Sequence, residues 1–380
     1  MSDYIPYGLH WIDDEDIKEV IKVLRGKWIA TGPKIKEFED VFAKYIGCKY
    51  AVSVSSGTSA LDIAIASLDL KKDSEIITTP FTFVATSNMI LLNGLKPVFV
   101  DIKPDTYNIN PDEIEKKITN KTKAILYMDY AGQPCDIDEI KRIAKEHGLY
   151  LIEDAAHALG AEYKNRKVGC FADLTCFSFY PVKHITTGEG GMVTTNNEDL
   201  YKKLLMLRNH GIDKPTSERF GSKAFYAYDM KLLGKNYRIT DFQCALGISQ
   251  LKKLENFLKL RENIASTYSK EFKNDDVKTP DVKQNIRHAW HLYTLLLPDR
   301  VDRDKFFSLM RSRNIGVNVH YTPVYRHSYY RERYTIKSSD FPVTEDIFKR
   351  TITIPIFPRM TKEQVNKVIS EVRSASRNQA

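Results

Sequence analysis

The 380-residue sequence predicts an α/β protein, with a large domain built on a mostly parallel central sheet and a smaller C-terminal α/β domain. Segments with the period of an amphipathic helix alternate with short runs rich in β-branched residues, as in parallel strands covered by helices. The chain is also longer than one hydrophobic core normally supports. We therefore expect a large domain over residues 1–250 and a small domain over residues 251–380, linked by a long helix over residues 251–272.

The elements of the large domain can be assigned in order. A helix over residues 34–47 should place Phe38, Val41, Phe42 and Tyr45 on one face and end at a glycine. Short apolar runs bounded by turn residues then predict strands, most of them followed by helical patterns. The segments expected to contain these strands are 50–68, which also holds a turn and a helix, 75–80, 96–102, 122–132, 149–160 and 177–195.

The amino-acid composition limits the class of protein and the kinds of partner that we expect. Hydrophobic residues make up 42% of the chain and charged residues 28%, as in ordinary globular proteins. The net charge of +8 comes without a long basic run, so we expect no nucleic-acid partner, and an anionic small substrate fits as well. Five cysteines without CxxC spacing predict reduced thiols. Because neither a signal peptide nor a membrane span is recognisable, we expect a cytoplasmic protein without membrane contact.

One lysine, Lys183, stands in an unusual setting. It follows the alternating segment FSFY, residues 177–180, and precedes Gly188, Gly190 and Gly191, which permit close backbone approach before another β-like run. Most lysines are solvated surface charges because burying an ammonium is costly. A lysine held at a glycine-rich turn between two strands could instead be a nucleophilic amine, if its surroundings lower its pKa.

Two predicted strand ends carry further candidate groups. In SSGTSAL, Gly57 and Thr58 lie where a strand passes into a helix, so backbone N–H groups there could bind phosphate, although an ordinary N-cap explains the same residues. In LYLIEDAAHA, Asp154 ends an apolar strand, where it could contact a ligand or only cap the next helix. Together with Lys183, these groups have one economical explanation, a pyridoxal 5′-phosphate site. No metal site is expected.

Motifs spread over nearly the whole chain then carry a family resemblance. They are KWIATGPKIKEFE, SSGTSAL, FTFVATSN, PVFVDI, EDAAHALGAEY, FSFYPVKHITTGEGG, LRNHG, NYRITDFQCALG and VHYTPVY. By these motifs the sequence resembles the DegT/DnrJ/EryC1/StrS family of sugar aminotransferases. The resemblance implies the fold of aspartate aminotransferase, fold type I of the pyridoxal-phosphate-dependent transferases. It also implies an enzyme of amino-sugar and polysaccharide biosynthesis with pyridoxal 5′-phosphate as cofactor.

The resemblance assigns roles to individual residues. It implies that Lys183 forms the Schiff base with the cofactor and that Asp154 contacts the pyridine nitrogen. Phe83 occupies the position whose ring stacks on the cofactor. His157 matches a position that is glutamine in many relatives and touches the cofactor ring or its phenolic oxygen. The residues implied to bind the phosphate are Gly57, Thr58 and Ser178.

A second subunit is implied as well. The resemblance has Asn236, in NYRITDFQCALG, reach the cofactor phosphate of a neighbouring subunit, so we expect a homodimer with shared active sites. Local physics alone predicts from this motif only a helix capped by Thr240. His320 and Tyr321, in VHYTPVY, are implied to lie near the substrate. The aromatic and basic residues at 325–327 could meet a nucleotide or form a solvated basic loop.

The reaction implied is a ping-pong transfer of an amino group from L-glutamate to the keto carbon of a nucleotide-linked 4-keto-6-deoxy sugar. The motifs DAAHALG, FSFYPVKHITTGEGG and DYAGQP resemble most the enzymes that aminate C4 of UDP-linked sugars, as in the pseudaminic acid pathway. The alternatives within the fold are a C3 aminotransferase, a sugar 3-dehydratase with histidine in place of the lysine, and a non-catalytic regulatory homologue. A nicotinamide-binding enzyme is disfavoured because GEGG opens a strand.

Overall fold

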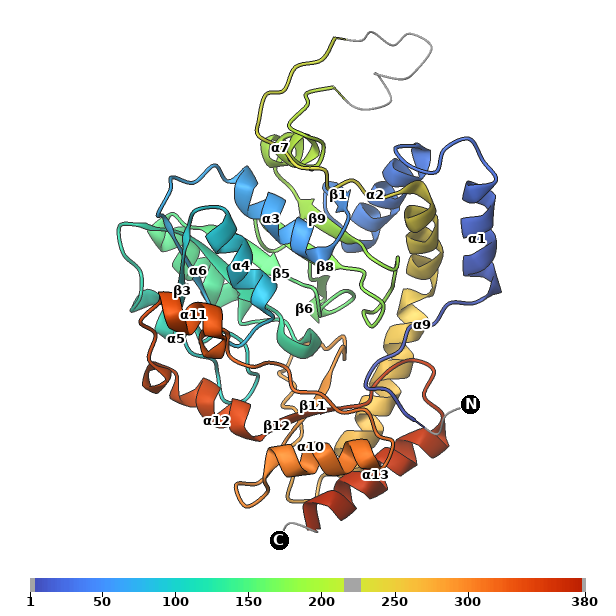
Figure 1. The fold of residues 1–380 in the computed structure, drawn as a ribbon, viewed down its shortest axis with the longest axis vertical. Helices are drawn as coiled ribbons and strands as arrows, with labels where there is room; N and C mark the ends of the chain where they lie inside the picture. Colours follow the sequence, from blue (N-terminus) through green and yellow to red (C-terminus); the bar gives the residue numbers. More distant parts are fainter. Residues whose placement is uncertain (1–3, 215–226, 378–380) are drawn as a thin grey trace.

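The computed structural model describes residues 4–214 and 227–377 and has a seven-stranded sheet at its centre (Figure 1). The strand order is β1-β9-β8-β5-β4-β2-β3. Strand β9 runs antiparallel to both of its neighbours, and the other neighbouring strands are parallel. The predicted α/β class is therefore confirmed. The strands are β1 (Tyr50–Val54), β2 (Glu75–Thr78), β3 (Lys96–Phe99), β4 (Thr122–Met128), β5 (Tyr150–Asp154), β8 (Leu174–Ser178) and β9 (Gly191–Thr195).

Helices cover both faces of this sheet (Figure 1). The helices on one face are α3 (Gly57–Ser67), α4 (Val84–Leu92) and α7 (Glu198–Arg208). Those on the other are α2 (Pro33–Ile46), α5 (Pro111–Glu115), α6 (Ile137–His147) and the N-terminal half of α9 (Asp241–Glu271). Because both faces are covered, the central strands are largely buried, as in β9, where all five residues are buried.

The helix predicted over residues 34–47 is α2, and its apolar face is narrower than expected. Phe38 and Phe42 are fully buried and contact the ring of Phe179 beyond β8. Val41, expected on the same face, is 36% exposed because it lies at the edge of the apolar stripe. Two large aromatic side chains thus dominate the contact of α2 with the sheet.

Helix α9 connects the large sheet to a smaller one. It begins at Asp241, where Thr240 caps it as predicted and a glutamine completes a capping box, and it runs without a break into the helix predicted over residues 251–272. Its C-terminal half packs against the antiparallel pair β11 (Tyr293–Leu296) and β12 (Thr351–Ile354). Ile5 from the N-terminal segment joins this smaller core. The division at residue 250 therefore falls within α9 and stays a prediction.

The remaining elements surround the smaller sheet and the edge of the large one. Helices α10 (Arg303–Ser312) and α13 (Lys362–Arg377) pack into the smaller core. Helices α11 (Ser328–Arg333) and α12 (Pro342–Arg350) lie towards the β3 side of the large sheet (Figure 1). Among the described helices, none is both long and apolar enough to cross a membrane. The other helices and strands are α1 (Asp14–Leu24), β6 (Glu162–Tyr163), β7 (Arg166–Lys167) and β10 (Ile286–Arg287).

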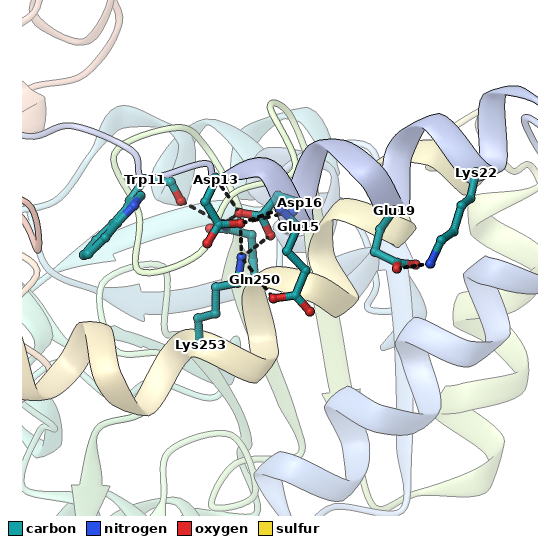
Figure 2. Close-up of polar contacts among 8 residues, drawn as sticks. All are labelled: Trp11, Asp13, Glu15, Asp16, Glu19, Lys22, Gln250 and Lys253. Carbon is teal, nitrogen blue, oxygen red and sulfur yellow. Dashed lines mark hydrogen bonds and ion pairs between the residues drawn. The ribbon is translucent and has the colours of Figure 1, made fainter.

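A polar cluster ties the N-terminal segment to α9 (Figure 2). Asp13 and Asp16 cap the start of α1 reciprocally, and both form ion pairs with Lys253 of α9. The side-chain amide of Gln250 donates to Asp16 Oδ2 (2.7 Å) and to the carbonyl of Trp11 (2.8 Å). Asp16 is fully buried. The cluster fixes the chain just before α1, and that part of the chain reaches the cavity described below.

Replacing Lys253 with methionine should lower the free energy of unfolding by about 1–3 kcal/mol, because the buried Asp16 carboxylate loses its cationic partner. Lys22→Met is the matched control, since the pair of Lys22 with Glu19 is more exposed and such pairs contribute about 0–1 kcal/mol. Urea denaturation followed by circular dichroism measures both variants. Equal losses in the two would show that the cluster does not anchor α1.

Candidate active site

Most of the predicted site residues surround one cavity of about 600 Å³. It lies at the carboxyl ends of β5 and β8 beside the N-terminus of α3, the edge at which parallel sheets bind ligands. Tyr7 of the N-terminal segment lines one side. His320 and Tyr321, from the segment after α10, line another. Parts of the chain that are far apart in sequence therefore form the cavity together.

Lys183 lies in a tight turn after β8, so the strand ends before the lysine. In this turn the N–H of Lys183 donates to the carbonyl of Tyr180 (2.9 Å). Glycine is required at Gly190, because a Cβ there would lie 2.2 Å from Oγ1 of Thr187. Burial lowers the pKa of the Lys183 amine to about 8, against the opposing effect of a nearby carboxylate. Much of the amine is therefore in its neutral, nucleophilic form at mildly alkaline pH.

That carboxylate is Asp154, which ends β5 and lines the cavity. Its Oδ2 accepts a hydrogen bond from Thr86 Oγ1 (2.9 Å), and its Oδ1 accepts one from the N–H of Ala156 (3.1 Å). Burial raises the pKa of Asp154, while these two hydrogen bonds and Lys183 oppose the rise. A cationic N–H entering the cavity would favour the ionised carboxylate. A pyridinium nitrogen is a group of this kind.

The start of α3 forms an anion cradle beside these groups. Ser56 caps the helix by accepting a hydrogen bond from the N–H of Ser59 (3.0 Å). Among the described residues, the N–H groups of Gly57 and Thr58 have no partner, and they point out of the positive end of the helix. A Cβ at Gly57 would lie 2.7 Å from Cβ of Ser178, so glycine is needed to bring this helix against β8. The N-cap and the phosphate interpretations are thus compatible.

A wall of imidazole and aromatic rings completes the cavity. The hydroxyl of Tyr321 lies 2.9 Å from Nε2 of His157. The ring centroid of Tyr321 lies 6.0 Å from that of Phe83. Phe83 is 53% exposed, so its ring is available to a ligand. His320 Nδ1 lies 2.8 Å from Thr353 Oγ1, and burial lowers the pKa of His320 to about 3. Burial also lowers the pKa of His157 well below its ordinary value, so both rings are neutral.

All but one of the predicted site residues therefore line this cavity. They are Gly57, Thr58, Phe83, Asp154, His157, Ser178, Lys183, His320 and Tyr321. The exception is Asn236, which is exposed and pairs through its backbone with Asn209. Its sequence neighbours Lys235 and Tyr237 both bind Asp62 of α3. The position of Asn236 is thus fixed by α3 of the same chain.

The basic loop at 325–327 lies outside the cavity lining. The Tyr325 hydroxyl donates to Glu345 of α12 (2.7 Å), and the Arg326 guanidinium pairs with the same carboxylate. His327 is exposed. Two of these three residues therefore hold α12 in place, and a role in nucleotide binding stays a prediction.

A comparison with known proteins decides the family. The model of the DegT/DnrJ/EryC1/StrS aminotransferase family matches residues 10–373. The chain belongs to this family. The resemblance inferred from the motifs is therefore confirmed, and with it the prediction that this protein is an aminotransferase.

Two relatives show how far the similarity extends. The spore coat polysaccharide biosynthesis protein SpsC of Bacillus subtilis is 40% identical over 377 residues, which are 98% of this aminotransferase and 97% of SpsC. A UDP-4-amino-4,6-dideoxy-N-acetyl-beta-L-altrosamine transaminase of Campylobacter jejuni is 41% identical over 362 residues, 94% of this chain and 93% of the relative. Both similarities cover nearly the full length of both chains.

Two solved structures are similar over the whole fold. Helicobacter pylori PseC, an aminotransferase involved in the biosynthesis of pseudoaminic acid, is 34% identical with a TM-score of 0.93 and covers 99% of this chain and 100% of its own. The PLP-form of Spr1654 from Streptococcus pneumoniae, described as a sugar aminotransferase, is 28% identical with a TM-score of 0.93, with coverage of 99% and 100%. The predicted aminotransferase fold is confirmed.

The sequence did not point to several residues that line the aminotransferase cavity. Thr86 follows Phe83 by one helical turn in FTFVAT, and that spacing was the available signal that it shares a side with the cavity. Tyr7 and Asn318 gave no signal, because only the packing of remote segments brings them here. His291, near the start of β11, was also missed, and it lies against Lys183.

The lowered pKa of Lys183 predicts its reactivity. In the full-length protein freed of cofactor, pulses of acetic anhydride should acylate Lys183 with a half-maximal rate near pH 8, because only the neutral amine reacts. A lysine peptide, with a pKa of about 10.4, is the reference. Since the folded pKa is the lower one, the reactive form is present above pH 8 and is lost as the pH falls through 8. Mass spectrometry of the labelled peptide measures the profile, and a midpoint above about pH 9.5 would contradict burial of the amine.

Proposed function

We propose that this protein transfers an amino group from L-glutamate to the C4 keto carbon of a UDP-linked 4-keto-6-deoxy sugar, with pyridoxal 5′-phosphate as cofactor. Glutamate becomes 2-oxoglutarate, and the sugar carbonyl becomes an amine, so that atoms and electrons balance over the two half-reactions. The observation that carries the proposal is the meeting of Lys183, Asp154 and the α3 cradle in one cavity. An amine, a carboxylate and an anion site are the three groups that this cofactor requires.

The residues that line the cavity fit pyridoxal 5′-phosphate. The cofactor supplies an electron sink that stabilises the carbanion formed next to the transferred nitrogen. Asp154 would keep the ring nitrogen protonated, held in place by Thr86 and the N–H of Ala156. Gly57 and Thr58 would donate N–H groups to the phosphate, with the Ser178 hydroxyl beside them.

Lys183 carries the proton chemistry in this proposal. Its amine would hold the cofactor covalently and, when free, would act as base and acid by moving a proton at the substrate carbon. A pKa of about 8 suits the amine both for taking up a proton and for returning it, because the proton is neither bound too tightly nor lost too easily. His157, bonded to the Tyr321 hydroxyl, would touch the edge of the cofactor ring. Phe83 would cover its face.

The substrate class rests on the relatives. The Campylobacter relative is named for a UDP-linked 4-amino-4,6-dideoxy sugar, and PseC is described by its place in pseudoaminic acid biosynthesis. A net charge of +8 suits an anionic nucleotide sugar. His320 and Tyr321 would contact the sugar from the side of the smaller sheet. All five cysteines are unpaired, as a reducing cytoplasm favours, and we place the reaction there.

The alternatives fit the cavity less well. A dehydratase of this fold uses a histidine in place of the lysine, and the neighbouring His184 is committed elsewhere, with Nε2 lying 3.0 Å from the carbonyl of Ala289. A regulatory homologue would be expected to lack Lys183 or Asp154, and both are present. A C3 aminotransferase would use the same residues, so substrate panels must separate it from the C4 reaction.

We further propose that two subunits share each site, with Asn236 reaching the cofactor phosphate of the neighbouring subunit. Asn236 is exposed and does not line the cavity of its own chain. The residues on either side of it are tied to Asp62, so the side chain is presented from a fixed backbone. A rigid, outward-facing amide suits a contact with a partner.

The direct test is an absorbance titration. The purified protein with bound cofactor should be yellow, and L-glutamate should bleach the colour, which a UDP-linked 4-keto sugar should then restore. Lys183→Ala should fold and show no turnover, because it lacks both the covalent anchor and the proton carrier. Addition of 2-oxoglutarate is the control for the reverse half-reaction. Turnover near the wild-type rate in Lys183→Ala, or no colour change with glutamate, would refute the proposal.

Shared sites can be tested by mixing two variants. A mixture of the Lys183→Ala and Asn236→Ala variants should recover activity after subunit exchange, because one site of each mixed dimer then carries neither substitution. The loss of one hydrogen bond to a charged phosphate should weaken cofactor binding by roughly 10- to 150-fold, so the assay uses limiting cofactor. Activity that stays at the average of the two parents, with exchange confirmed by mass spectrometry, would place Asn236 outside the neighbouring site.

A further inference from the structure

His291 faces the amine of Lys183 from the smaller-sheet side of the cavity. Its Nε2 lies 3.5 Å from Nζ of Lys183. The imidazole is 5% exposed, and its ring centroid lies 4.3 Å from that of His157. Among the described residues, His291 Nδ1 has no hydrogen-bond partner. The ring therefore contacts the reactive lysine directly, although it lies more than a hundred residues later in the chain.

The backbone around His291 is held from two sides. On one side, the buried guanidinium of Arg261 donates to the carbonyls of Trp290 (3.2 Å) and His291 (3.4 Å). On the other, the N–H of Leu292 donates to the carbonyl of Ala131 (3.2 Å) in the large domain. The position of the ring is thus set by α9 and by the large domain together.

A glycine allows this close approach. Gly132 has a φ of +104°, and a Cβ on it would lie 2.7 Å from the carbonyl oxygen of His157 and 3.1 Å from the N–H nitrogen of Trp290. The N–H of Ala289 also donates to the Gly132 carbonyl (2.9 Å). The segment that contains His291 therefore packs closely against the segment that contains His157.

The imidazoles around Lys183 are uncharged. Burial is the first cause that lowers the pKa of His291 well below its ordinary value, and the charges of Lys183 and Arg261 lower it further. Burial likewise lowers the pKa values of the other rings, so none of them is protonated above pH 7. The titratable or charged groups that face Lys183 or His291 are Asp154, His157, His184, Arg261 and His320.

We propose that His291 is a positioning residue for Lys183: its neutral Nε2 accepts a hydrogen bond from the lysine amine whenever that amine is free. With Nε2 as the acceptor, the ring proton lies on Nδ1. The inference rests on the proposed function, in which the amine alternates between a bound and a free form. A flexible four-carbon side chain released into a 600 Å³ cavity would otherwise sample many orientations. The hydrogen bond keeps the amine within reach of the substrate carbon.

The hydrogen bond also has an electrostatic consequence. A neutral acceptor stabilises the ammonium form of Lys183 more than the amine form, so it raises the pKa of the lysine against the larger effect of burial. A charged imidazole would do the opposite. Removing the acceptor should therefore shift Lys183 towards an even lower pKa and release its side chain.

Three substitutions at His291 separate this role from packing. His291→Leu removes the acceptor, His291→Gln places an amide close to the former Nε2, and His291→Asn places one close to the former Nδ1. The matched control is His288→Gln, because His288 is buried in the same segment and accepts from the N–H of Trp290 (2.8 Å) without facing Lys183. It should lower thermal stability and leave Lys183 labelling unchanged.

The readout is the pH profile of Lys183 acylation in the full-length chain freed of cofactor. His291→Leu and His291→Asn should lower the midpoint by about one pH unit, and His291→Gln should stay near wild type. In the loaded enzyme, the first two should lower kcat by roughly 10- to 100-fold with KM for glutamate little changed, because the amine is misplaced only after release.

Two comparisons of the labelling midpoints decide whether His291 positions Lys183. Equal midpoints for wild type, His291→Leu and His291→Asn would overturn the inference, even if activity fell. Equal behaviour of His291→Gln and His291→Asn would overturn it as well, and this comparison remains if the leucine variant does not fold. Failure of glutamate to bleach the wild-type protein would refute the proposed function, whereas the labelling shifts would still test the contact between His291 and Lys183.

Discussion

The site depends on keeping an amine and a carboxylate together in one buried cavity. Burying either group alone is costly, and the structure lowers the pKa of Lys183 and raises that of Asp154 accordingly. Each group favours the charged form of the other, and Thr86 adds a hydrogen bond to the carboxylate. The large sheet and the helices that cover it support this arrangement. Strand β5 delivers the acid, and the turn after β8 delivers the base.

Closure of the cavity depends on contacts between the two parts of the chain. Helix α9 contributes to both cores, and its buried Arg261 bonds three backbone carbonyls of the smaller part, those of Trp290, His291 and Ile356. The N-terminal segment is tied to the same helix by Gln250 and Lys253 (Figure 2), and its Tyr7 lines a further side of the cavity. One long helix thus positions both walls that face the sheet edge. A change in the packing of α9 would therefore change the positions of the residues that line the cavity.

The two adjacent acids of LYLIEDAAHA show how a strand separates structure from chemistry. Successive side chains of a strand point to opposite faces, so Glu153 points away from the cavity that Asp154 lines. Glu153 accepts hydrogen bonds from Tyr127 (3.1 Å), Thr175 (2.8 Å) and a backbone N–H. Burial raises its pKa to about 7. Glu153 therefore joins neighbouring strands, and the ligand chemistry belongs to Asp154.

The sequence by itself determined the fold class and most of the cavity, because its strand ends, glycine turns and motifs are local in the chain. Lys183, Asp154 and Gly57 could be recognised in this way, since chemistry at a parallel sheet edge follows from the ends of the strands. The exposure of Val41 and the union of two predicted helices into the single helix α9 depend on how the packed surfaces meet. Only the tertiary structure brought Tyr7 and His291 to the site, because the N-terminal segment and the segment before β11 must both fold against the edge of the large sheet to reach it.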